Sequence, residues 1–354
     1  MTSEIWILGG AGRVGRTVAV NLTAKKLNVV LVGRDRGRLE QVGAPLGPLA
    51  RTVVVESTDA MIAQLKALPA TVVVNTIGPF ARTGEAIIRT GRPGSHYVDI
   101  SNELFATRDA LAMHDEAVAA GRTLVTGAGW GVLGTESVTL KLCEGRQAAQ
   151  EVRVDMVPSI EGDGGPIGEV LAATILDGIA AGGWRYVNGE LVRAAFGSEP
   201  EHLTLPDGTK VTTGSAPTAE LEAAQRASGA PKVTAASAMV PTGTLARLAM
   251  PVMMGLARSQ ALRRLLTRRI AKATPAASNK PREHSWARAR VRWADGTSRL
   301  GWLRAPDGMR FTGAVAAEVA ARLARGEGRP GAYTPGSLFG YPLAEAVGGQ
   351  LVIE

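Results

Sequence analysis

The sequence predicts an α/β fold class, in which an N-terminal doubly wound parallel sheet is followed by a second, smaller α+β domain. Of the 354 residues, 45% are hydrophobic and 20% are charged, an ordinary globular composition in a chain long enough for two domains. In the first half, short β-branched runs alternate with helical patterns, as in consecutive βαβ units. After Glu136 this alternation stops, which indicates a change of architecture.

Six short apolar runs in the first half are expected to be strands covered on both faces. They do not alternate with polar residues, and helical periodicity separates most of them. The expected strands are Ile5–Leu8, Val29–Val32, Thr52–Val55, Thr71–Asn75, Tyr97–Ile100 and Thr123–Thr126, and the expected helices cover residues 13–24, 59–68, 83–91 and 104–120. Six strands with short crossovers make a complete Rossmann sheet.

The second half has the mixed pattern of an α+β domain. Asp295-Gly296, between two strand-like runs, is a hairpin signal. Extended segments are expected at 150–157, 184–193, 202–213, 286–293 and 298–303, and helices at about 169–179, 245–272 and 313–325. We therefore divide the chain into a Rossmann domain (1–135), an α+β substrate or dimerisation domain (136–329) and a Gly- and Pro-rich segment (330–354) that packs back on the body.

Composition excludes several classes of protein. Cys143 is the single cysteine and the four histidines lack metal-ligand spacing, so no metal site is expected. The N-terminus has no basic region or cleavage site, which favours a cytoplasmic protein. The formal net charge of +8 favours acidic partners. Nucleic acid is not expected among them, because only 4% of residues are aromatic and no binding motif is present.

Two stretches in the second half, one apolar and one basic, have alternative interpretations. Val240–Ala257 is apolar, but Arg247 and Pro251 interrupt it and it is too short to predict a membrane span. The next stretch, 258–272, is a basic helix, expected to be solvated. The alternative is a basic surface for a membrane or an acidic carrier protein. Its apolar face has Leu262, Leu265, Leu266 and Ile270, while Arg263, Arg264, Arg268 and Lys272 lie mostly off that face and Arg269 within it.

A glycine-rich turn follows the first expected strand and opens the first helix. The spacing Gly10-x-Gly12-x-x-Gly15 is that of a dinucleotide-binding loop. Gly10 permits the tight turn, Gly12 lets the backbone approach the pyrophosphate, and Gly15 lets the helix pack against the strand. Free N–H groups at the helix N-terminus favour the phosphates. The predicted cofactor-binding residues here are Gly9, Gly10, Gly12, Arg13, Val14 and Gly15.

The end of the second strand predicts which dinucleotide binds. NAD-binding sites usually place an acid there for the ribose 2′-hydroxyl. This strand instead ends at Gly33 and is followed by Arg34, which can bond a 2′-phosphate. Asp35 is the counter-candidate for a ribose. NADPH is therefore expected, in preference to NADH.

Two further strand ends are expected to face the cofactor, because sites in such sheets lie at the carboxyl ends of the strands. Asn75 ends the fourth strand, Gly78 and Pro79 follow it, and all three are predicted to lie against the nicotinamide ribose. Asp99 lies at the end of the fifth strand and Glu103 just after it, where the alternatives are acid catalysis and helix capping.

These residues resemble the saccharopine dehydrogenase-like oxidoreductases. The matching motifs are Gly9-Gly-Ala-Gly-Arg-Val-Gly15, Gly33-Arg34, Asn75-x-x-Gly-Pro-Phe80, His96-Tyr-Val-Asp-Ile-Ser-x-Glu103, Gly127-Ala-Gly-Trp130 and, more loosely, Tyr333-Thr-Pro-Gly-Ser-Leu-Phe-Gly340. The resemblance implies a Rossmann domain with an inserted substrate domain, and NADPH or NADH as hydride donor. Relatives often carry an aspartate after the position of Trp130. This sequence lacks it, so an acid role there would pass to Glu136.

The resulting hypothesis is an NADPH-dependent reductase of a small-molecule substrate. The resemblance implies hydride transfer to the C=N bond of an amino-acid-derived imine or, alternatively, to the C=C bond of a carrier- or lipid-linked enoyl group by an enzyme acting in trans. A non-catalytic dinucleotide-binding scaffold is the third alternative, and a homodimer is an expected assembly. The candidate proton donors are Tyr97, Asp99, Glu103 and Glu136.

Overall fold

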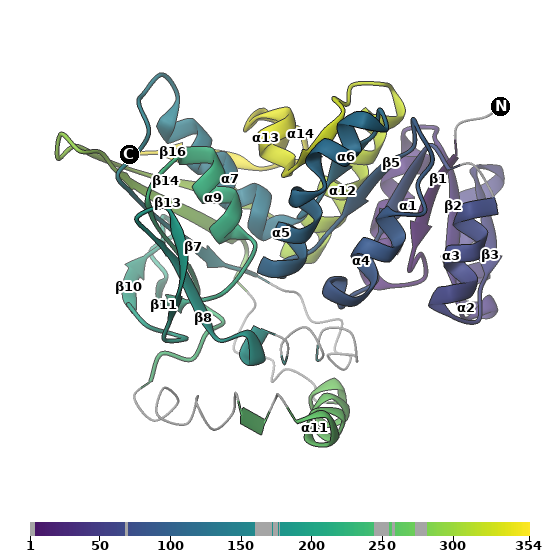
Figure 1. The fold of residues 1–354 in the computed structure, drawn as a ribbon, viewed down its shortest axis with the longest axis horizontal. Coiled ribbons are helices and arrows are strands. Elements are labelled where there is room, and N and C mark those ends of the chain that lie inside the picture. Colours follow the sequence, from purple (N-terminus) through teal and green to yellow (C-terminus); the bar gives the residue numbers. More distant parts are fainter. Residues whose placement is uncertain are drawn as a thin grey trace. The chain divides into compact units, whose positions relative to one another are not determined.

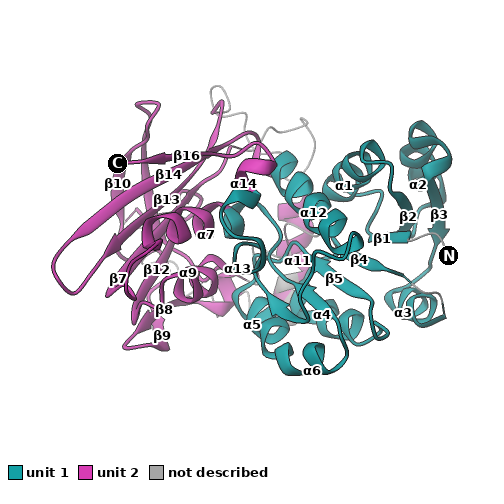
Figure 2. Cartoon of the chain, turned by 90° about the horizontal axis from the view of Figure 1, so that it is seen from above, with its two compact units in different colours: residues 1–133, 309–343 teal, residues 134–308, 344–354 magenta. Residues whose placement is uncertain are grey.

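The chain forms two compact units (Figure 2). The computed structural model describes residues 4–67, 70–159, 172, 176, 178–243, 255–256, 259–272 and 282–354. Unit 1 comprises residues 1–133 and 309–343, and unit 2 comprises residues 134–308 and 344–354. The predicted helix at 169–179 and the apolar stretch 240–257 lie mostly outside the described residues.

Unit 1 is built on a parallel sheet of seven strands in the order β15-β6-β5-β4-β1-β2-β3 (Figure 1). The strands are β1 (Glu4–Leu8), β2 (Asn28–Gly33), β3 (Ala50–Val54), β4 (Val72–Asn75), β5 (His96–Asp99), β6 (Thr123–Val125) and β15 (Gly331–Tyr333). The six predicted strands are confirmed. The seventh, β15, comes from the C-terminal segment and pairs in parallel with β6.

Helices cover both faces of this sheet (Figure 2). They are α1 (Arg13–Ala24), α2 (Arg36–Gly43), a 3₁₀ helix (Ala44–Leu49), α3 (Thr58–Ala67), α4 (Phe80–Ile88), α5 (Leu104–Ala112), α6 (His114–Ala119), α12 (Gly308–Ala324) and α13 (Pro335–Phe339). Apolar side chains of the central strands are almost fully buried, among them Trp6, Leu8 and Val30. Strands without an exposed face cannot show polar alternation, which is why the apolar runs identified them.

Helix α2 was not predicted from the sequence. Its eight residues include two glycines, and Leu39 is its one large buried side chain, so the amphipathic signal is weak. The N-terminus of α2 is stabilised by its N-cap residue Asp35, whose carboxylate accepts a hydrogen bond from the Arg38 N–H at 3.0 Å.

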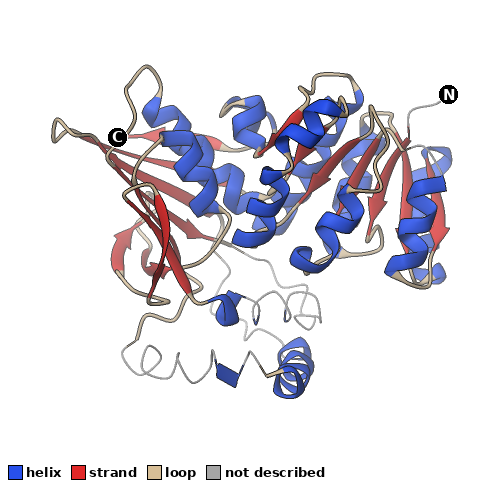
Figure 3. Cartoon of the chain, viewed as in Figure 1, coloured by secondary structure: helices blue, strands red, loops and turns tan. Residues whose placement is uncertain are grey.

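Unit 2 contains a mixed sheet of nine strands (Figure 3). The main path is β10-β11-β12-β7-β13-β14-β16, and β8 pairs with both β12 and β9. The strands are β7 (Glu151–Val157), β8 (Gly183–Val187), β9 (Glu190–Ala194), β10 (Glu201–Thr204), β11 (Lys210–Ser215), β12 (Lys232–Ser237), β13 (Ser285–Arg292), β14 (Ser298–Ala305) and β16 (Gln350–Ile353). The predicted Asp295-Gly296 hairpin is confirmed, with β13 and β14 antiparallel and Arg292 opposite Ser298.

Helices complete unit 2. They are α9 (Glu220–Ser228) and α11 (Gln260–Lys272), while α7 (Trp130–Cys143) and α14 (Pro342–Ala346) cross the unit boundaries. No helix in the described part of the chain has the length and apolar character needed to cross a membrane.

A buried ionic cluster joins the strands of unit 2. Asp155 on β7 is fully buried and accepts hydrogen bonds from Arg153 at 3.1 Å, Thr213 at 2.7 Å and Arg288 at 3.0 Å. Arg288 also bonds Glu201 on β10 at 2.9 Å. Removing one partner of such a buried pair leaves an uncompensated charge, so the cluster constrains which strands meet here.

The units differ from the domain boundaries expected from the sequence. Residues 309–329 were placed in the second domain, but α12 belongs almost entirely to unit 1. The segment 330–354 is divided, because β15 joins the sheet of unit 1 and β16 joins that of unit 2. Unit 2 is also not the smaller of the two. Periodicity identifies a helix or strand but not the sheet on which it packs.

Close packing of α12 on α1 gives a stability test. A Cβ atom at Gly313 would lie 2.5 Å from Thr17 Cβ, whereas one at Gly37 would meet only the Asp35 side chain at 3.6 Å. We expect Gly313→Ala to lower the free energy of unfolding by about 1–3 kcal/mol through overpacking. The matched change Gly37→Ala is expected to raise it by about 0.4–1 kcal/mol. Urea denaturation measures both, and shifts of the same sign would contradict this packing.

Candidate dinucleotide-binding site

The loops that follow β1, β4, β5 and β6 all leave the carboxyl edge of the parallel sheet of unit 1. Hydrogen bonds connect neighbouring loops. The Thr76 hydroxyl donates to Leu8 O at 2.7 Å, and the Ala128 N–H donates to Asp99 O at 2.7 Å. Ligands of open parallel sheets bind at this edge. The structure thus gathers the predicted residues of unit 1 around one location.

The glycine loop after β1 has the geometry that a dinucleotide requires. Gly9 has a φ of +79°, and the N–H groups of Gly9 and Gly10 both donate to Val32 O, at 2.9 and 3.1 Å. A Cβ at Gly10 would lie 3.0 Å from Leu31 Cα, and one at Gly15 would overlap Gly9 O. At Gly12 only Gly9 O would come within 4 Å. Packing therefore requires Gly10 and Gly15, while Gly12 leaves the outer side of the loop open for a phosphate.

Helix α1 begins directly after this loop. Gly12 is its N-cap residue and provides no side-chain cap, and no acid lies in the first turn. The positive end of the helix dipole is thus uncompensated by side-chain charge within α1, which suits an anionic ligand. Arg13 is half-buried, whereas the Val14 side chain is buried in the core, so any contact of Val14 with a cofactor would be through its backbone.

The end of β2 fits a 2′-phosphate better than a ribose hydroxyl. Gly33 carries no acid, and the Asp35 carboxylate is engaged as the N-cap of α2. Arg34 is exposed and forms no ion pair with any residue that the structure describes. Its guanidinium is thus available to an incoming phosphate, which it can bond with two parallel N–H groups.

Asn75 organises the loop after β4. The side chain is fully buried, and its Nδ2 donates to the Tyr97 hydroxyl at 3.1 Å while its Oδ1 accepts from Ile77 N at 3.0 Å. Gly78 and Pro79 are partly exposed between this anchor and the start of α4. Asn75 therefore shapes the loop, and Gly78 and Pro79 form its accessible part.

Tyr97 and Asp99 lie on β5 and are almost inaccessible, at 1% and 2% exposure. Asp99 Oδ1 accepts hydrogen bonds from Ser101 N, Thr126 Oγ1 and Gly127 N, each at 2.9 Å. Burial raises the pKa of the Asp99 carboxyl and also raises the pKa of the Tyr97 hydroxyl well above its usual value. These contacts support a role for Asp99 in holding the loops after β5 and β6 together.

Glu103 caps a helix to which it does not belong. Its two carboxylate oxygens accept hydrogen bonds from Phe80 N and Ala81 N, both at 2.9 Å, at the N-terminus of α4. An acid so placed satisfies two helix-terminal donors and complements the helix dipole. The sequence suggested capping as an alternative to catalysis, but no spacing rule indicates a helix that begins 23 residues earlier.

The fourth acid candidate belongs to the other unit. Glu136 is fully buried on α7 and belongs to unit 2, whereas Tyr97, Asp99 and Glu103 belong to unit 1. No group of three metal-ligating side chains is present among the described residues.

Sequence reasoning missed several residues that position the loops. Thr312 on α12 accepts a hydrogen bond from Trp130 N at 3.1 Å, and Phe311 packs edge-on against the Trp130 ring. Thr76 and Thr126, described above, were also missed. Hydroxyls that bond backbone or buried carboxylates leave no pattern in one sequence, and α12 was assigned to the other domain.

Comparison with known proteins identifies the domain that carries this site. Residues 5–125 match the family model of the saccharopine dehydrogenase NADP binding domain. By this match, the segment is similar to the NADP-binding domain of saccharopine dehydrogenases. The predicted resemblance to saccharopine dehydrogenase-like oxidoreductases is therefore confirmed, and NADPH is the cofactor that the family supports.

Further similarities are found to a solved structure and to curated proteins. Saccharopine dehydrogenase (L-Glu forming) from Saccharomyces cerevisiae shares the fold over 99% of both chains, with a TM-score of 0.65 and 13% identity. Trans-acting enoyl reductases of Mycobacterium leprae and Mycobacterium ulcerans are each 29% identical over 134 residues, 36% of this chain. The chain spans about a third of the length of these curated relatives, with 32% of each covered. The family match supports NADP binding by residues 5–125, and the solved structure shows the fold.

The position of Arg34 at the NADP-binding domain gives a test of cofactor selection. We expect Arg34→Ala to weaken NADPH binding by about 1.5–3 kcal/mol, the value of a hydrogen bond to a charged group, and to leave NADH binding nearly unchanged. Arg38→Ala, which removes an exposed arginine one turn into α2, is the control and should affect neither cofactor. Titration of NADPH and NADH fluorescence measures the affinities. Equal losses for both cofactors would refute the assignment.

The capping contact of Glu103 gives a second test. We expect Glu103→Gln to lower the free energy of unfolding by about 0.5–2 kcal/mol, the range for loss of a helix cap, without a large loss of turnover. Glu85→Gln, at an exposed position on α4, is the control and should lower the free energy of unfolding by less than about 1 kcal/mol. If stability is unchanged while turnover falls by about 10²–10⁴, Glu103 is a proton donor and not a cap.

Proposed function

We propose that this protein is an NADPH-dependent reductase that acts in trans on the C=C bond of an enoyl group, carried as a thioester by a carrier protein or a lipid-linked intermediate. The observation that carries the proposal is the sequence match to trans-acting enoyl reductases. The likeness to saccharopine dehydrogenase is at 13% identity and supports the fold alone. For this reason the enoyl substrate is preferred to the imine.

The proposed reaction adds a hydride to the β carbon of the enoyl group and a proton to the α carbon. When bound, NADPH supplies the hydride. The chain contributes binding and orientation, since hydride transfer depends mainly on holding donor and acceptor in contact and excluding water. We assign pyrophosphate binding to Gly12 and the start of α1, the 2′-phosphate to Arg34, and the nicotinamide side to Gly78 and Pro79.

The source of the proton follows from contacts already described. Asp99 and Glu103 use their carboxylates to hold backbone N–H groups, and Tyr97 is buried against Asn75. We therefore assign these three residues to positioning the loops. Proton delivery is assigned to water, or to Glu136 if unit 2 supplies an acid.

The imine and scaffold alternatives make different predictions from the enoyl proposal. A reductase of amino-acid-derived imines would oxidise NADPH in the presence of an amino acid and an aldehyde. A non-catalytic scaffold would bind NADPH but would not oxidise it with either substrate.

Substrate choice is tested by following NADPH absorbance with two acceptors, crotonyl N-acetylcysteamine thioester and a mixture of an amino acid with an aldehyde. We expect oxidation with the enoyl thioester and a saturated thioester product by mass spectrometry. Gly12→Val, which places a branched side chain where the pyrophosphate must approach, should abolish NADPH binding and turnover while preserving the fold. Oxidation only with the imine mixture, or with neither acceptor, would overturn the proposal.

A further inference from the structure

Helix α11 has an unusual distribution of charge. Its thirteen residues, Gln260–Lys272, include no acid and five cations. Among the side chains of α11 that the structure describes, five are exposed, and we call them the α11 basic face: Arg264, Leu265, Arg268, Arg269 and Lys272. At 3.6 residues per turn, these five positions fall within one side of the helix. Leu262, Leu266 and Ile270 are half-buried and lie outside this face, and Ala271 is buried at its edge next to Arg264.

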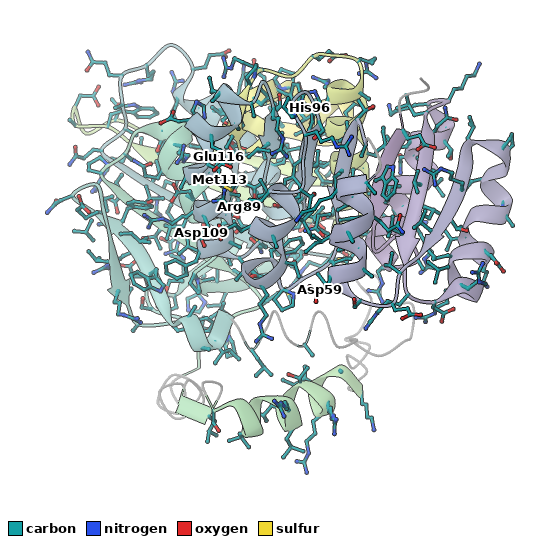
Figure 4. All side chains as sticks on the ribbon, turned by 45° about the vertical axis from the view of Figure 1, so that its right-hand side comes forward. Asp59, Arg89, His96, Asp109, Met113 and Glu116 are labelled. Carbon is teal, nitrogen blue, oxygen red and sulfur yellow. The ribbon has the colours of Figure 1, made fainter. Side chains whose placement is uncertain are left out.

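The four cations of the α11 basic face have no ion-pair partner among the residues that the structure describes. Exposure alone does not explain this. Arg89, at the end of α4, is also exposed, yet it pairs with Glu85 at 2.9 Å and with Glu116 at 2.9 Å. Figure 4 labels Arg89 and Glu116. Arg264, Arg268 and Lys272 are spaced four residues apart, where like charges repel by about 0.2–0.5 kcal/mol per pair. The face thus concentrates positive charge at a cost to the helix.

Leu265 is an exposed apolar side chain among the four cations of the α11 basic face. It is 50% exposed and lies between the arginines and Lys272 on the same side of the helix. Helices that insert into membranes expose a broad apolar face and keep their cations at its edges. Here a single leucine is exposed among four cations, and the other described apolar side chains are at least partly covered. The pattern fits an acidic protein surface with a small apolar contact better than a lipid bilayer.

We propose that the α11 basic face is the docking surface for an acidic carrier protein that delivers the acyl substrate. This rests on the proposed function, because a reductase acting in trans must recognise the protein that bears its substrate. Carboxylates on the carrier pair with Arg264, Arg268, Arg269 and Lys272 and steer its approach, and Leu265 packs against an apolar side chain of the carrier. Such charge complementarity acts mainly on the rate of association and on partner choice.

The test is a charge reversal, Arg264→Glu/Arg268→Glu, in the full-length protein. The control is Lys66→Glu/Lys210→Glu, which makes the same change in net charge at two exposed lysines outside α11. Melting temperature establishes that each variant is folded, and Arg268→Ala provides a milder second variant. The probes are a fluorescently labelled acyl carrier protein of fatty-acid synthesis bearing a crotonyl-pantetheine thioester, crotonyl N-acetylcysteamine, and phosphatidylcholine vesicles containing phosphatidylglycerol.

We expect the wild-type protein to bind the carrier with an affinity that falls as salt is added, and the double reversal to weaken binding by about tenfold or more. The control should bind as the wild type does. The KM for the carrier-borne thioester should rise in the double reversal, while kcat/KM for crotonyl N-acetylcysteamine stays unchanged in both variants.

Binding and turnover can fail separately. Salt-sensitive carrier binding that is lost on charge reversal supports the docking surface even if no thioester is reduced, an outcome that would refute only the enoyl function. Equal binding by wild type and double reversal, no carrier binding by the wild type, or binding to the anionic vesicles alone would each overturn the docking proposal. Reduction of crotonyl N-acetylcysteamine in those cases would leave the enoyl function standing.

Discussion

The close approach between the turn after β1 and the N-terminus of α1 is the constraint on which the nucleotide site depends. Any side chain at Gly15 would collide with Gly9 O, and one at Gly10 would press on Leu31 of the neighbouring strand. Because neither glycine has a side chain, the first turn of α1 packs close to the end of β1, and its free N–H groups point away from the sheet edge. The same turn is held by Val32 O, which accepts hydrogen bonds from two glycine N–H groups, so the glycine loop is fixed to the end of β2, which Arg34 follows.

Carboxylates at the other strand ends act on backbone. Asp99 joins the loops after β5 and β6, and Glu103 joins the start of α5 to the start of α4. A charged acceptor of N–H groups forms stronger bonds than a neutral one, which suits loops that must stay ordered around a ligand. These two carboxylates, one buried and one half-buried, thus shape the edge of the sheet where a nucleotide is expected, and the exposed Arg34 lies at the end of β2 on the same edge.

Unit 2 is organised by a different interaction. Its sheet buries the carboxylate of Asp155 between two arginines and a threonine, and Glu201 on β10 extends the network to Arg288 and Arg290 on β13. Every charge in this network meets an opposite one. The α11 basic face contrasts with it, since its cations have no such partners within the described residues, and this contrast is what points to an external acidic surface.

The sequence by itself determined the class of fold and the position of the glycine loop. Gly10, Gly12 and Gly15 follow an apolar strand at a spacing with a direct mechanical cause, and buried parallel strands appear as uninterrupted β-branched runs. Gly33 and Arg34 could likewise be interpreted from the sequence, because the residues at the end of the second strand of a Rossmann sheet contact the adenine ribose or its 2′-phosphate. These signals are local, so they survive without knowledge of the rest of the chain.

Only the tertiary structure decided what the polar residues at the strand ends do and where the C-terminal elements belong. Glu103 meets Phe80 N and Ala81 N, Trp130 meets Thr312, and β15 completes the sheet of unit 1, all through contacts between residues distant in sequence. Periodicity records which side of an element is apolar but not which element covers it. A carboxylate has the same appearance in a sequence whether it caps a helix or donates a proton, and the difference lies in the groups that surround it after folding.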